Sequence, residues 1–317
     1  MIPVVFISDE NFIMQTHIAM KSLIMNKNPD TEYDIFVVMA ECSEAKKKEL
    51  SVLASDQIHV NFVEASLEEF RDIKQLAHIP IACLLKFKIC DFVKDYDKLI
   101  YLDGDIIVRG DLTKLYEIEL GDAYAAAVPS LETIYLDERR INAGVMLFNA
   151  KKMRENAMSQ KLISYRKGLG DRGSMDQQTF NLVMGDEITI LPCEYNCIPH
   201  KIIGPEKNIF KIEDLNNLYG TNYTSSKDMV KDAIIIHYAT GGKPWKYTYI
   251  PCGEEWYTYY KKSIYSGTKL KRDNKLQAHM KGFVRVLKNK GIKGILGRIK
   301  YYTIDRNKID DTTKNWG

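Results

Sequence analysis

The sequence predicts an α/β protein, with a mostly parallel central sheet flanked by helices and a basic helical region at the C-terminal end. Short apolar runs alternate with segments of helical periodicity through the first hundred residues, which is typical of βαβ units around a parallel sheet. Acidic residues directly follow two of these runs, and lysine and arginine are concentrated in the last fifth of the chain. The 317 residues, 45% hydrophobic and 27% charged, suffice for a large core and exclude disordered and fibrous proteins.

Seven apolar runs predict strands. The first is VVFIS, and the third, IHVNFVEA, alternates between apolar and polar residues as a half-buried strand does. The fourth, LIYL, ends directly before an aspartate. The predicted strands cover residues 4–8, 33–40, 58–65, 99–102, 123–129, 142–150 and 233–239.

Helical periodicity predicts helices between these strands. A first helix ends at Met25. Ser43 is a good N-cap for the Lys- and Glu-rich helix after it, and Ser66 with Glu69 forms a capping-box pattern for another. The remaining helices are expected over residues 82–95, over residues 151–167 and from about Ser174 onward.

The segment KLIYLDGDIIVRGDL places Asp103 and Asp105 on either side of Gly104 at the carboxyl end of a strand, where open parallel sheets bind ligands. Residues two apart in an extended segment point to the same face, so both carboxylates can be directed at one point while Gly104 leaves the other face open. Such oxygen ligands suit Mg²⁺ or Mn²⁺. A solvated turn is the alternative, but the apolar residues on both sides favour the edge of a core, where a cation would compensate the two carboxylates.

A histidine and a lysine far downstream are candidate partners of this pair. His237 directly follows the run AIII, and imidazole is a normal ligand of Mn²⁺-like metals. A histidine that is only hydrogen-bonded at a strand end is the alternative. In the following TGGKPWK, two glycines let the backbone approach a ligand and Lys243 suits a phosphate; a plain loop ended by Pro244 is the competing interpretation.

Five motifs, in this order, resemble those of the family-eight retaining glycosyltransferases. This family includes bacterial lipopolysaccharide galactosyl- and glucosyltransferases and, more remotely, glycogenin. The resemblance covers about residues 1–250, and five ordered motifs are far more specific than one aspartate pair. The motifs are Ser8-Asp-Glu-Asn11, KLIYLDGD at 98–105, NAGVMLFN at 142–149, Asp176-Gln177, and His237-Tyr followed by Gly-Lys-Pro-Trp at 242–245.

The resemblance implies a GT-A fold, a single nucleotide-binding α/β domain that uses UDP-galactose or UDP-glucose with Mn²⁺, or with Mg²⁺ as the alternative. Asp103, Asp105 and His237 would hold the metal against the diphosphate, and Lys243 would neutralise it further. The remaining implied roles are nucleoside contacts for Ser8, Asp9 and Asn11, donor contacts for Gly104 and Gly241, the sugar and acceptor side for Asn142, donor hydroxyls for Asp176, and a place beneath the anomeric carbon for Gln177.

Two positions depart from the family pattern. Where the family usually carries an arginine before the aspartate pair, this chain has Lys86, which would serve the diphosphate or the sugar without the bidentate contact of arginine. The family's glycine three residues past the histidine is Thr240 here, with Gly241 and Gly242 following it. We therefore expect a slightly shifted phosphate loop.

Retention ordinarily requires a carboxylate nucleophile within about 3 to 3.5 Å of the anomeric carbon. The matching residue here is Gln177, whose amide is a weak nucleophile. We therefore expect front-face substitution through an oxocarbenium-like state, in which a donor phosphate oxygen takes the proton of the acceptor hydroxyl. Without the resemblance, Asp176 and Gln177 would be interpreted more simply as the first turn of a helix, where aspartate favours the dipole.

The six cysteines contain no C-x-x-C pair, as expected for reduced thiols of a cytosolic protein. Cys193, Cys197 and His200 could suggest zinc, but their irregular spacing favours buried thiols. No apolar run approaches the roughly 20 residues that span a bilayer, and the first residues lack the pattern of a signal peptide. A cytoplasmic location is therefore expected.

The basic region, residues 263–317, is the second predicted unit after a catalytic domain at 1–262. Eleven lysines and arginines lie between residues 269 and 300, against Asp273 alone. Residues 283–302 interleave these cations with apolar residues, which suits a helix lying in an anionic membrane surface on the cytosolic face. A solvated helix packed on the domain is the alternative. Nucleic-acid binding is not expected, because no recognition motif accompanies the charge.

Together these features predict a Mn²⁺-dependent retaining glycosyltransferase. It would move galactose or glucose from a UDP-sugar to a hydroxyl of a lipid-linked or cell-surface glycan, such as lipopolysaccharide or capsule. The alternatives are a glycogenin-like or protein-directed glucosyltransferase, which the basic tail disfavours, and a UDP-sugar-binding protein without activity, which the set Asp103, Asp105 and His237 disfavours.

Overall fold

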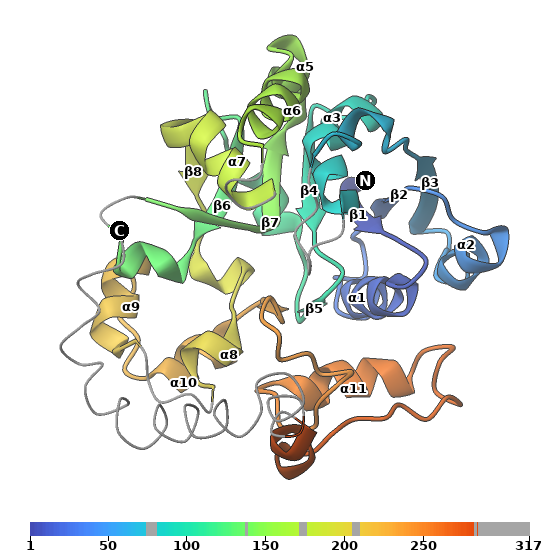
Figure 1. Cartoon of the computed structure of the whole chain (residues 1–317), viewed down its shortest axis with the longest axis vertical. Helices are drawn as coiled ribbons and strands as arrows, with labels where there is room; N and C mark the ends of the chain where they lie inside the picture. The colour runs from blue at the N-terminus through green and yellow to red at the C-terminus, as the bar shows by residue number, and fades with distance from the viewer. Residues whose placement is uncertain (74–80, 137–138, 171–175, 205–209, 282–283, 285–317) are drawn as a thin grey trace.

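The computed structural model describes residues 1–73, 81–136, 139–170, 176–204, 210–281 and 284. Its centre is a seven-stranded sheet in the order β3-β2-β1-β4-β7-β6-β8 (Figure 1). Each of the seven predicted strands is present near its expected position; β5 and β8 were not predicted. The strands are β1 (Ile2–Ser8), β2 (Tyr33–Met39), β3 (Ile58–Glu64), β4 (Lys98–Leu102), β5 (Ile106–Val108), β6 (Ala125–Pro129), β7 (Ile141–Asn149), β8 (Ile188–Ile190) and β9 (Ile235–His237).

The sheet is mostly parallel, as predicted. Strands β3, β2, β1 and β4 run parallel to one another, and β6 runs parallel to β8. Strand β7 is antiparallel to both β4 and β6. Because of this reversal, the middle of β7 lies beside the end of β4: Leu102 pairs with Val145, and the Asp103 N–H donates to the Gly144 carbonyl oxygen at 2.8 Å.

Helices cover both faces of the sheet (Figure 1). Val4 and Phe6 pack in the core on the side of α1 and α11, whereas their neighbour Val5 packs in a second core with α3, α5, α6 and α7. This alternation is the two-residue period of a strand buried on both faces. The helices are α1 (Ile13–Met25), α2 (Glu44–Ser51), α3 (Ile89–Phe92), α4 (Thr113–Glu117), α5 (Ala150–Glu155), α6 (Met158–Gly168), α7 (Asp176–Met184), α8 (Pro199–Ile202), α9 (Ile212–Tyr219), α10 (Ser226–Asp232) and α11 (Gly253–Lys261).

Two predicted helices differ from the observed ones. The segment predicted as one helix over 82–95 is a 3₁₀ helix, Ile81–Lys88, followed by the single turn of α3. Its consecutive residues Leu84 to Phe87 are all buried, so packing on every side, rather than one amphipathic face, sets its geometry. The helix predicted over 151–167 is interrupted at Ala157, which has a left-handed backbone conformation with a φ of 49°. This residue separates α5 from α6 and is the N-cap of α6.

The predicted helix starts are partly correct. Ser43 occupies the N-cap of α2, but its hydroxyl caps no backbone N–H. Ser66 accepts a bond from the Glu68 N–H at 3.1 Å, and the residues after it form a 3₁₀ turn, Glu68–Phe70, instead of the expected helix. The helix expected from about Ser174 is α7, described from Asp176 onward; Ser174 itself lies outside the described residues.

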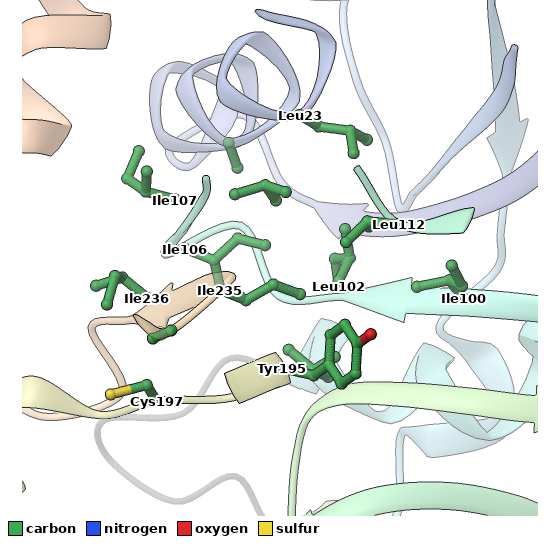
Figure 2. Close-up of a cluster of buried hydrophobic side chains, with 14 of the residues drawn as sticks. Leu23, Ile100, Leu102, Ile106, Ile107, Leu112, Tyr195, Cys197, Ile235 and Ile236 are labelled. Carbon is green, nitrogen blue, oxygen red and sulfur yellow. The ribbon is translucent and has the colours of Figure 1, made fainter. Parts of the chain in front are cut away.

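A second, two-stranded sheet joins β5 to β9 and holds the end of β9 against the aspartate segment. Ile106 pairs with His237, and the Tyr238 N–H donates to the Asp105 carbonyl oxygen at 2.9 Å. Figure 2 shows the apolar cluster around this ladder, where Leu102, Ile106 and Ile235 meet. Each fully buried Leu or Ile side chain contributes about 1.5–3 kcal/mol relative to exposure, so the cluster fixes the position of both strand ends.

The chain packs on the domain beyond α11. The Arg272 Nε donates to the Pro244 carbonyl oxygen at 2.8 Å, the Asp273 N–H to that of Lys246 at 2.8 Å, and the Thr248 N–H to that of Asp273 at 3.1 Å. Packed contacts therefore continue past the boundary predicted at residue 262. Of the basic segment 283–302, all residues except Val284 lie outside the described ranges. No described helix has both the length and the apolar character needed to cross a membrane.

Candidate functional site

Three side chains from different parts of the chain form what we call the metal-binding cluster: Asp103, Asp105 and His237. Asp103 directly follows β4, Asp105 directly precedes β5, and His237 ends β9. The β5–β9 ladder brings the histidine to the aspartates across more than a hundred residues of sequence. The His237 Nε2 lies 3.3 Å from Asp105 Oδ1 and 3.6 Å from Asp103 Oδ2.

The donor set of the metal-binding cluster fits a hard divalent cation. One ligand atom from each residue lies within 4.8 Å of the others, and among the described residues this is the set of acidic, histidine or cysteine side chains so arranged. Two carboxylates and an imidazole are ordinary ligands of Mn²⁺-like ions. Asp103 and Asp105 retain 31% and 13% of their side-chain exposure, so the cluster stays open to a ligand on one side.

Glycines allow this close approach. A Cβ added at Gly144 would lie 2.1 Å from His237 Cε1 and 2.9 Å from Asp103 Oδ2, so glycine alone fits there. A Cβ at Gly104 would lie 2.8 Å from Thr16 Oγ1, at the start of α1. Gly104 therefore has a packing role that the sequence did not indicate, while its contact with a donor stays a prediction.

The two aspartates have opposite electrostatic environments. Burial raises the pKa of Asp103, and the nearby Lys86 offsets this only in part. Burial also acts to raise the pKa of Asp105, but Lys243 and His237 outweigh it and hold that pKa well below its usual range. The Lys243 Nζ donates to Asp105 Oδ2 at 2.6 Å and to the Tyr238 carbonyl oxygen at 2.6 Å.

Lys86 connects the metal-binding cluster to the start of α7. Its side chain is 2% exposed, and its Nζ donates to Asp176 Oδ2 at 2.5 Å, to the Ala143 carbonyl oxygen at 2.9 Å and to Asp103 Oδ1 at 3.4 Å. Burial would lower the pKa of Lys86, but Asp103 and Asp176 raise it overall. The three N–H groups of the ammonium are thus already engaged, and the predicted contact of Lys86 with a donor remains a prediction.

Three carboxamides lie behind the metal-binding cluster. Gln177 Oε1 accepts from Asn142 Nδ2 at 3.1 Å, and Asn142 Oδ1 accepts from Asn196 Nδ2 at 2.8 Å. Asn181 holds α7 to β7, since its Oδ1 accepts from the Ile141 N–H at 2.8 Å. Asn196 and Asn181 were not predicted, because each is distinguished only by its hydrogen bond to a residue far away in the sequence.

The residues predicted for the nucleoside lie at the end of β1, beside β4. The Ser8 hydroxyl is buried and lies 2.9 Å from Thr16 Oγ1. Asp9 is partly exposed, with its Oδ1 accepting from the Asn11 N–H at 2.8 Å, and Asn11 is exposed. The adjacent strands β1 and β4 thus bring Asp9 to the same edge of the sheet as Asp103, as the sequence predicted.

A cavity of about 620 Å³, which we call the aromatic cavity, borders the loop after β9. Tyr135 and Phe210 stack within it at a centroid distance of 5.3 Å, and Lys201 and Glu132 form an ion pair at 2.5 Å. His200 lies in this wall, while Cys193 and Cys197 are buried nearby in sequence. The lining residues are Glu132, Tyr135, His200, Lys201, Phe210, Thr240, Gly241, Gly242, Tyr247, Tyr249 and Ile250.

The two glycines of the loop after β9 differ. A Cβ at Gly241 would meet no atom within 4 Å, whereas a Cβ at Gly242 would lie 2.9 Å from Ile250 Cδ1 and 3.0 Å from His200 Cδ2. The close packing that requires glycine is therefore at Gly242. Gly241 instead faces the aromatic cavity, two residues before Lys243.

Known sequences and one family model match most of this chain. The model of glycosyl transferase family 8 matches residues 3–249. Lipopolysaccharide 1,2-glucosyltransferase of Escherichia coli is 25% identical over 92% of this chain and 88% of its own length. Glycosyltransferases GlyD and GlyE of Streptococcus pneumoniae serotype 4 are 28% and 31% identical over 76% and 61% of this chain. The chain spans only 28% of the length of GlyD and 47% of that of GlyE.

Solved structures confirm the fold. An active-site mutant of LgtC superposes with a TM-score of 0.71 and 23% identity, covering 83% of this chain and 96% of LgtC. GlyE of Streptococcus pneumoniae TIGR4 superposes with a TM-score of 0.62 and 26% identity, covering 81% of this chain and 59% of GlyE. The GT-A fold expected from the sequence is therefore correct.

Proposed function

The chain belongs to glycosyl transferase family 8, and on that premise we propose that it is a retaining hexosyltransferase. It moves galactose or glucose from a UDP-sugar to a hydroxyl of a lipid-linked or cell-surface glycan, such as lipopolysaccharide or capsule. The observation that carries the proposal is the metal-binding cluster at the carboxyl end of β4, with Lys243 bonded to one of its carboxylates. This arrangement suits a diphosphate held between a cation and a lysine.

The donor half of the site follows from this cluster. Asp103, Asp105 and His237 would hold Mn²⁺, with Mg²⁺ as the alternative ion. When bound, the ion supplies positive charge to the leaving diphosphate. The Lys243 ammonium, which is bonded to Asp105, shifts toward the diphosphate and contacts it. Asp9 and Asn11, on the partly exposed edge after β1, contact the nucleoside.

The sugar half uses the start of α7. Asp176, held by Lys86, accepts bonds from donor hydroxyls, Asn142 lines the sugar and acceptor side, and Gln177 lies beneath the reacting carbon. Gln177 Oε1 already accepts from Asn142 Nδ2 at 3.1 Å and from the Ala143 N–H at 3.4 Å, which further weakens it as a nucleophile. This supports front-face substitution, in which a donor phosphate oxygen takes the proton of the acceptor hydroxyl. A trapped covalent sugar on Gln177 or Asp176 would contradict it.

The aromatic cavity is the proposed acceptor site. It lies against Gly241, on the loop that also carries Lys243. Tyr135, Phe210 and Tyr247 offer apolar ring faces for a pyranose, while Glu132 and Lys201 offer bonds to its hydroxyls. An uncharged or weakly charged sugar end of a glycan fits this mixture better than a peptide backbone does.

The basic tail would keep the enzyme at the cytosolic face of a membrane. Leu276, Met280 and Val284 are spaced four residues apart and are 69%, 61% and 46% exposed. Such spacing places them on one side of a helix, among lysines, as in helices that lie in a membrane surface. Flotation with anionic liposomes should be lost when all three are replaced by glutamine in the full chain, and unchanged flotation would remove the membrane proposal.

The decisive experiment for the activity is a panel of UDP-sugars tested for Mn²⁺-dependent hydrolysis and for transfer to glycan acceptors. We expect UDP-galactose or UDP-glucose to be turned over, with activity lost in Asp105→Asn. A UDP-sugar that binds without any turnover would indicate a binding protein instead. Labelling of the chain itself, with no acceptor added, would indicate a glycogenin-like enzyme.

A further inference from the structure

A continuous chain of four side chains runs behind the metal-binding cluster, from Gln177 through Asn142 and Asn196 to His237. After the two carboxamide bonds described above, the last link joins Asn196 Oδ1 to His237 Nδ1 at 2.8 Å. Asn196 and His237 are only 3% and 2% exposed. Buried polar groups of this kind must satisfy one another, so the donor and acceptor roles along the chain are not free to vary.

Two backbone N–H groups determine which atoms donate and which accept along this series of four side chains. A side-chain amide can be turned end for end with little change of shape, so its direction must be fixed by a group with only one role. The Gly144 N–H can only donate, and it donates to Asn142 Oδ1 at 3.0 Å. The Ala143 N–H likewise donates to Gln177 Oε1 at 3.4 Å. Asn142 therefore turns its oxygen toward Asn196 and its nitrogen toward Gln177.

The consequence passes along the chain to the histidine. Because Asn142 Oδ1 accepts, Asn196 must face it with Nδ2 and present its own oxygen to His237. His237 Nδ1 must then carry a hydrogen, which leaves the Nε2 lone pair of a neutral imidazole pointing at Asp103 and Asp105. A lone pair that faces two carboxylates becomes favourable once a proton or a metal ion lies between them, and a divalent ion contacts all three groups at once.

We propose that Asn196 is a positioning residue that fixes the tautomer and the ring orientation of His237 for metal binding, and that it couples this ligand to Gln177 through Asn142. This inference rests on the proposed function for the identity of the metal site. Asn196 lies in the sequence CEYNCIPH, where the cysteines suggest metal binding at first sight. The inference assigns the role in metal binding to Asn196 instead. Bonds from outside the ligand shell commonly tune metal affinity in this way.

Two substitutions separate the two bonds of Asn196. Asn196→Leu removes both, whereas Asn196→Asp keeps an acceptor for the His237 Nδ1–H but sets a second acceptor oxygen against Asn142 Oδ1. We expect Asn196→Leu to weaken Mn²⁺ affinity about tenfold to hundredfold. Asn196→Asp should keep Mn²⁺ affinity close to that of the wild type while kcat falls, because the chain to Gln177 is broken. Asn61→Leu, at a partly buried asparagine on β3, is the matched control.

The experiment is a Mn²⁺ titration of the full chain in the presence of UDP, followed by electron paramagnetic resonance, with the spin-echo modulation of the coordinated imidazole nitrogen as a second readout. The modulation should be lost or altered in Asn196→Leu and kept in Asn196→Asp. Circular dichroism and the unfolding temperature establish that each variant is folded. A folded Asn196→Leu that binds Mn²⁺ like the wild type would overturn the inference, as would an Asn196→Asp that is as weak as Asn196→Leu.

These outcomes are distinguishable from a failure of the proposed function. The affinity and the nitrogen signal require no glycosyl transfer, so the expected pattern in a chain that turns over no UDP-sugar would overturn the activity and support the role of Asn196. A wild-type chain that binds no Mn²⁺ would overturn both.

Discussion

The metal-binding cluster and the aromatic cavity share the loop after β9, but they are built in opposite ways. The cluster lies at strand ends, and its side chains are held by a buried bond to Asn196 and by partly buried bonds to Lys86 and Lys243. The cavity is walled mainly by loops and short helices, and Tyr135 in its wall is 59% exposed. On the proposed function, the comparison teaches that the sheet fixes the position of the donor site, whereas the loops around it would determine which acceptor binds.

The largest effect is expected from Asp105→Asn, in the metal-binding cluster. Removing one charge between His237 and Lys243 should lower kcat on the order of a thousandfold, because stabilisation of the leaving diphosphate depends on the bound cation. Steady-state transfer from a UDP-sugar measures it. The same substitution at the exposed Asp56 is the control, and an active Asp105→Asn would place the metal elsewhere.

Gly144→Ala tests how little room the cluster has. The added methyl would overlap His237 Cε1 and crowd Asp103 Oδ2, so we expect about tenfold to hundredfold weaker Mn²⁺ affinity. Calorimetric titration with Mn²⁺ and UDP checks this. Gly168→Ala, where a methyl meets no atom within 4 Å, should bind Mn²⁺ normally. Equal affinity in both variants would show that the cluster is less rigid than its contacts indicate.

Lys243→Ala lies on the shared loop and should have the next largest effect. The side chain contributes one cation to the diphosphate, and its loss should weaken donor affinity about tenfold, measured as the KM for UDP-sugar. Lys246→Ala changes an exposed lysine three residues along and serves as the matched control. If both substitutions act equally, general attraction of the loop for anions, rather than the position of Lys243, accounts for the effect.

Arg272→Ala tests whether the C-terminal region supports this loop. The guanidinium donates to the Pro244 carbonyl oxygen at 2.8 Å and lies over the Tyr257 ring at 4.5 Å, so it anchors the residues just after Lys243. We expect the KM for donor to rise about threefold to tenfold with kcat nearly unchanged. Lys271→Ala, at an exposed lysine, is the control. An unchanged KM for donor in Arg272→Ala would show that the C-terminal region does not support donor binding.

An effect as small as that of Arg272→Ala is expected at the acceptor side. Tyr135→Ala removes one ring from the aromatic cavity and should raise the KM for acceptor about threefold to tenfold, since an aromatic contact is worth about 0.5–1.5 kcal/mol. UDP-sugar hydrolysis should stay unchanged. Tyr165→Ala, an exposed tyrosine on α6, is the control. A parallel loss of hydrolysis would show that the two regions are not independent.

The same contrast explains what the sequence could predict. The sequence identified Asp103, Asp105 and His237 because each directly follows or precedes a buried apolar run. Burying a charged or imidazole side chain at such a place costs free energy unless the side chain is paired or binds a ligand. The strands were predicted for a related reason, since their runs are short, apolar and separated by helical segments.

The residues that could not be predicted depend on contacts between distant segments. Gly144 must be glycine because antiparallel β7 passes beside Asp103 and His237 there, and no local pattern shows that contact. Asn196 is buried 41 residues before its partner His237. The 3₁₀ helix Ile81–Lys88 was predicted as part of a longer α-helix because its packing on all sides is a tertiary property.

The most direct test of the central claim is a crystal structure of the full chain with Mn²⁺ and UDP, in which the anomalous scattering of manganese locates the ion. The account predicts the ion between Asp103 Oδ2, Asp105 Oδ1 and His237 Nε2, with Lys243 on the diphosphate. An ion held by other residues, or UDP bound away from the carboxyl ends of β1 and β4, would contradict it.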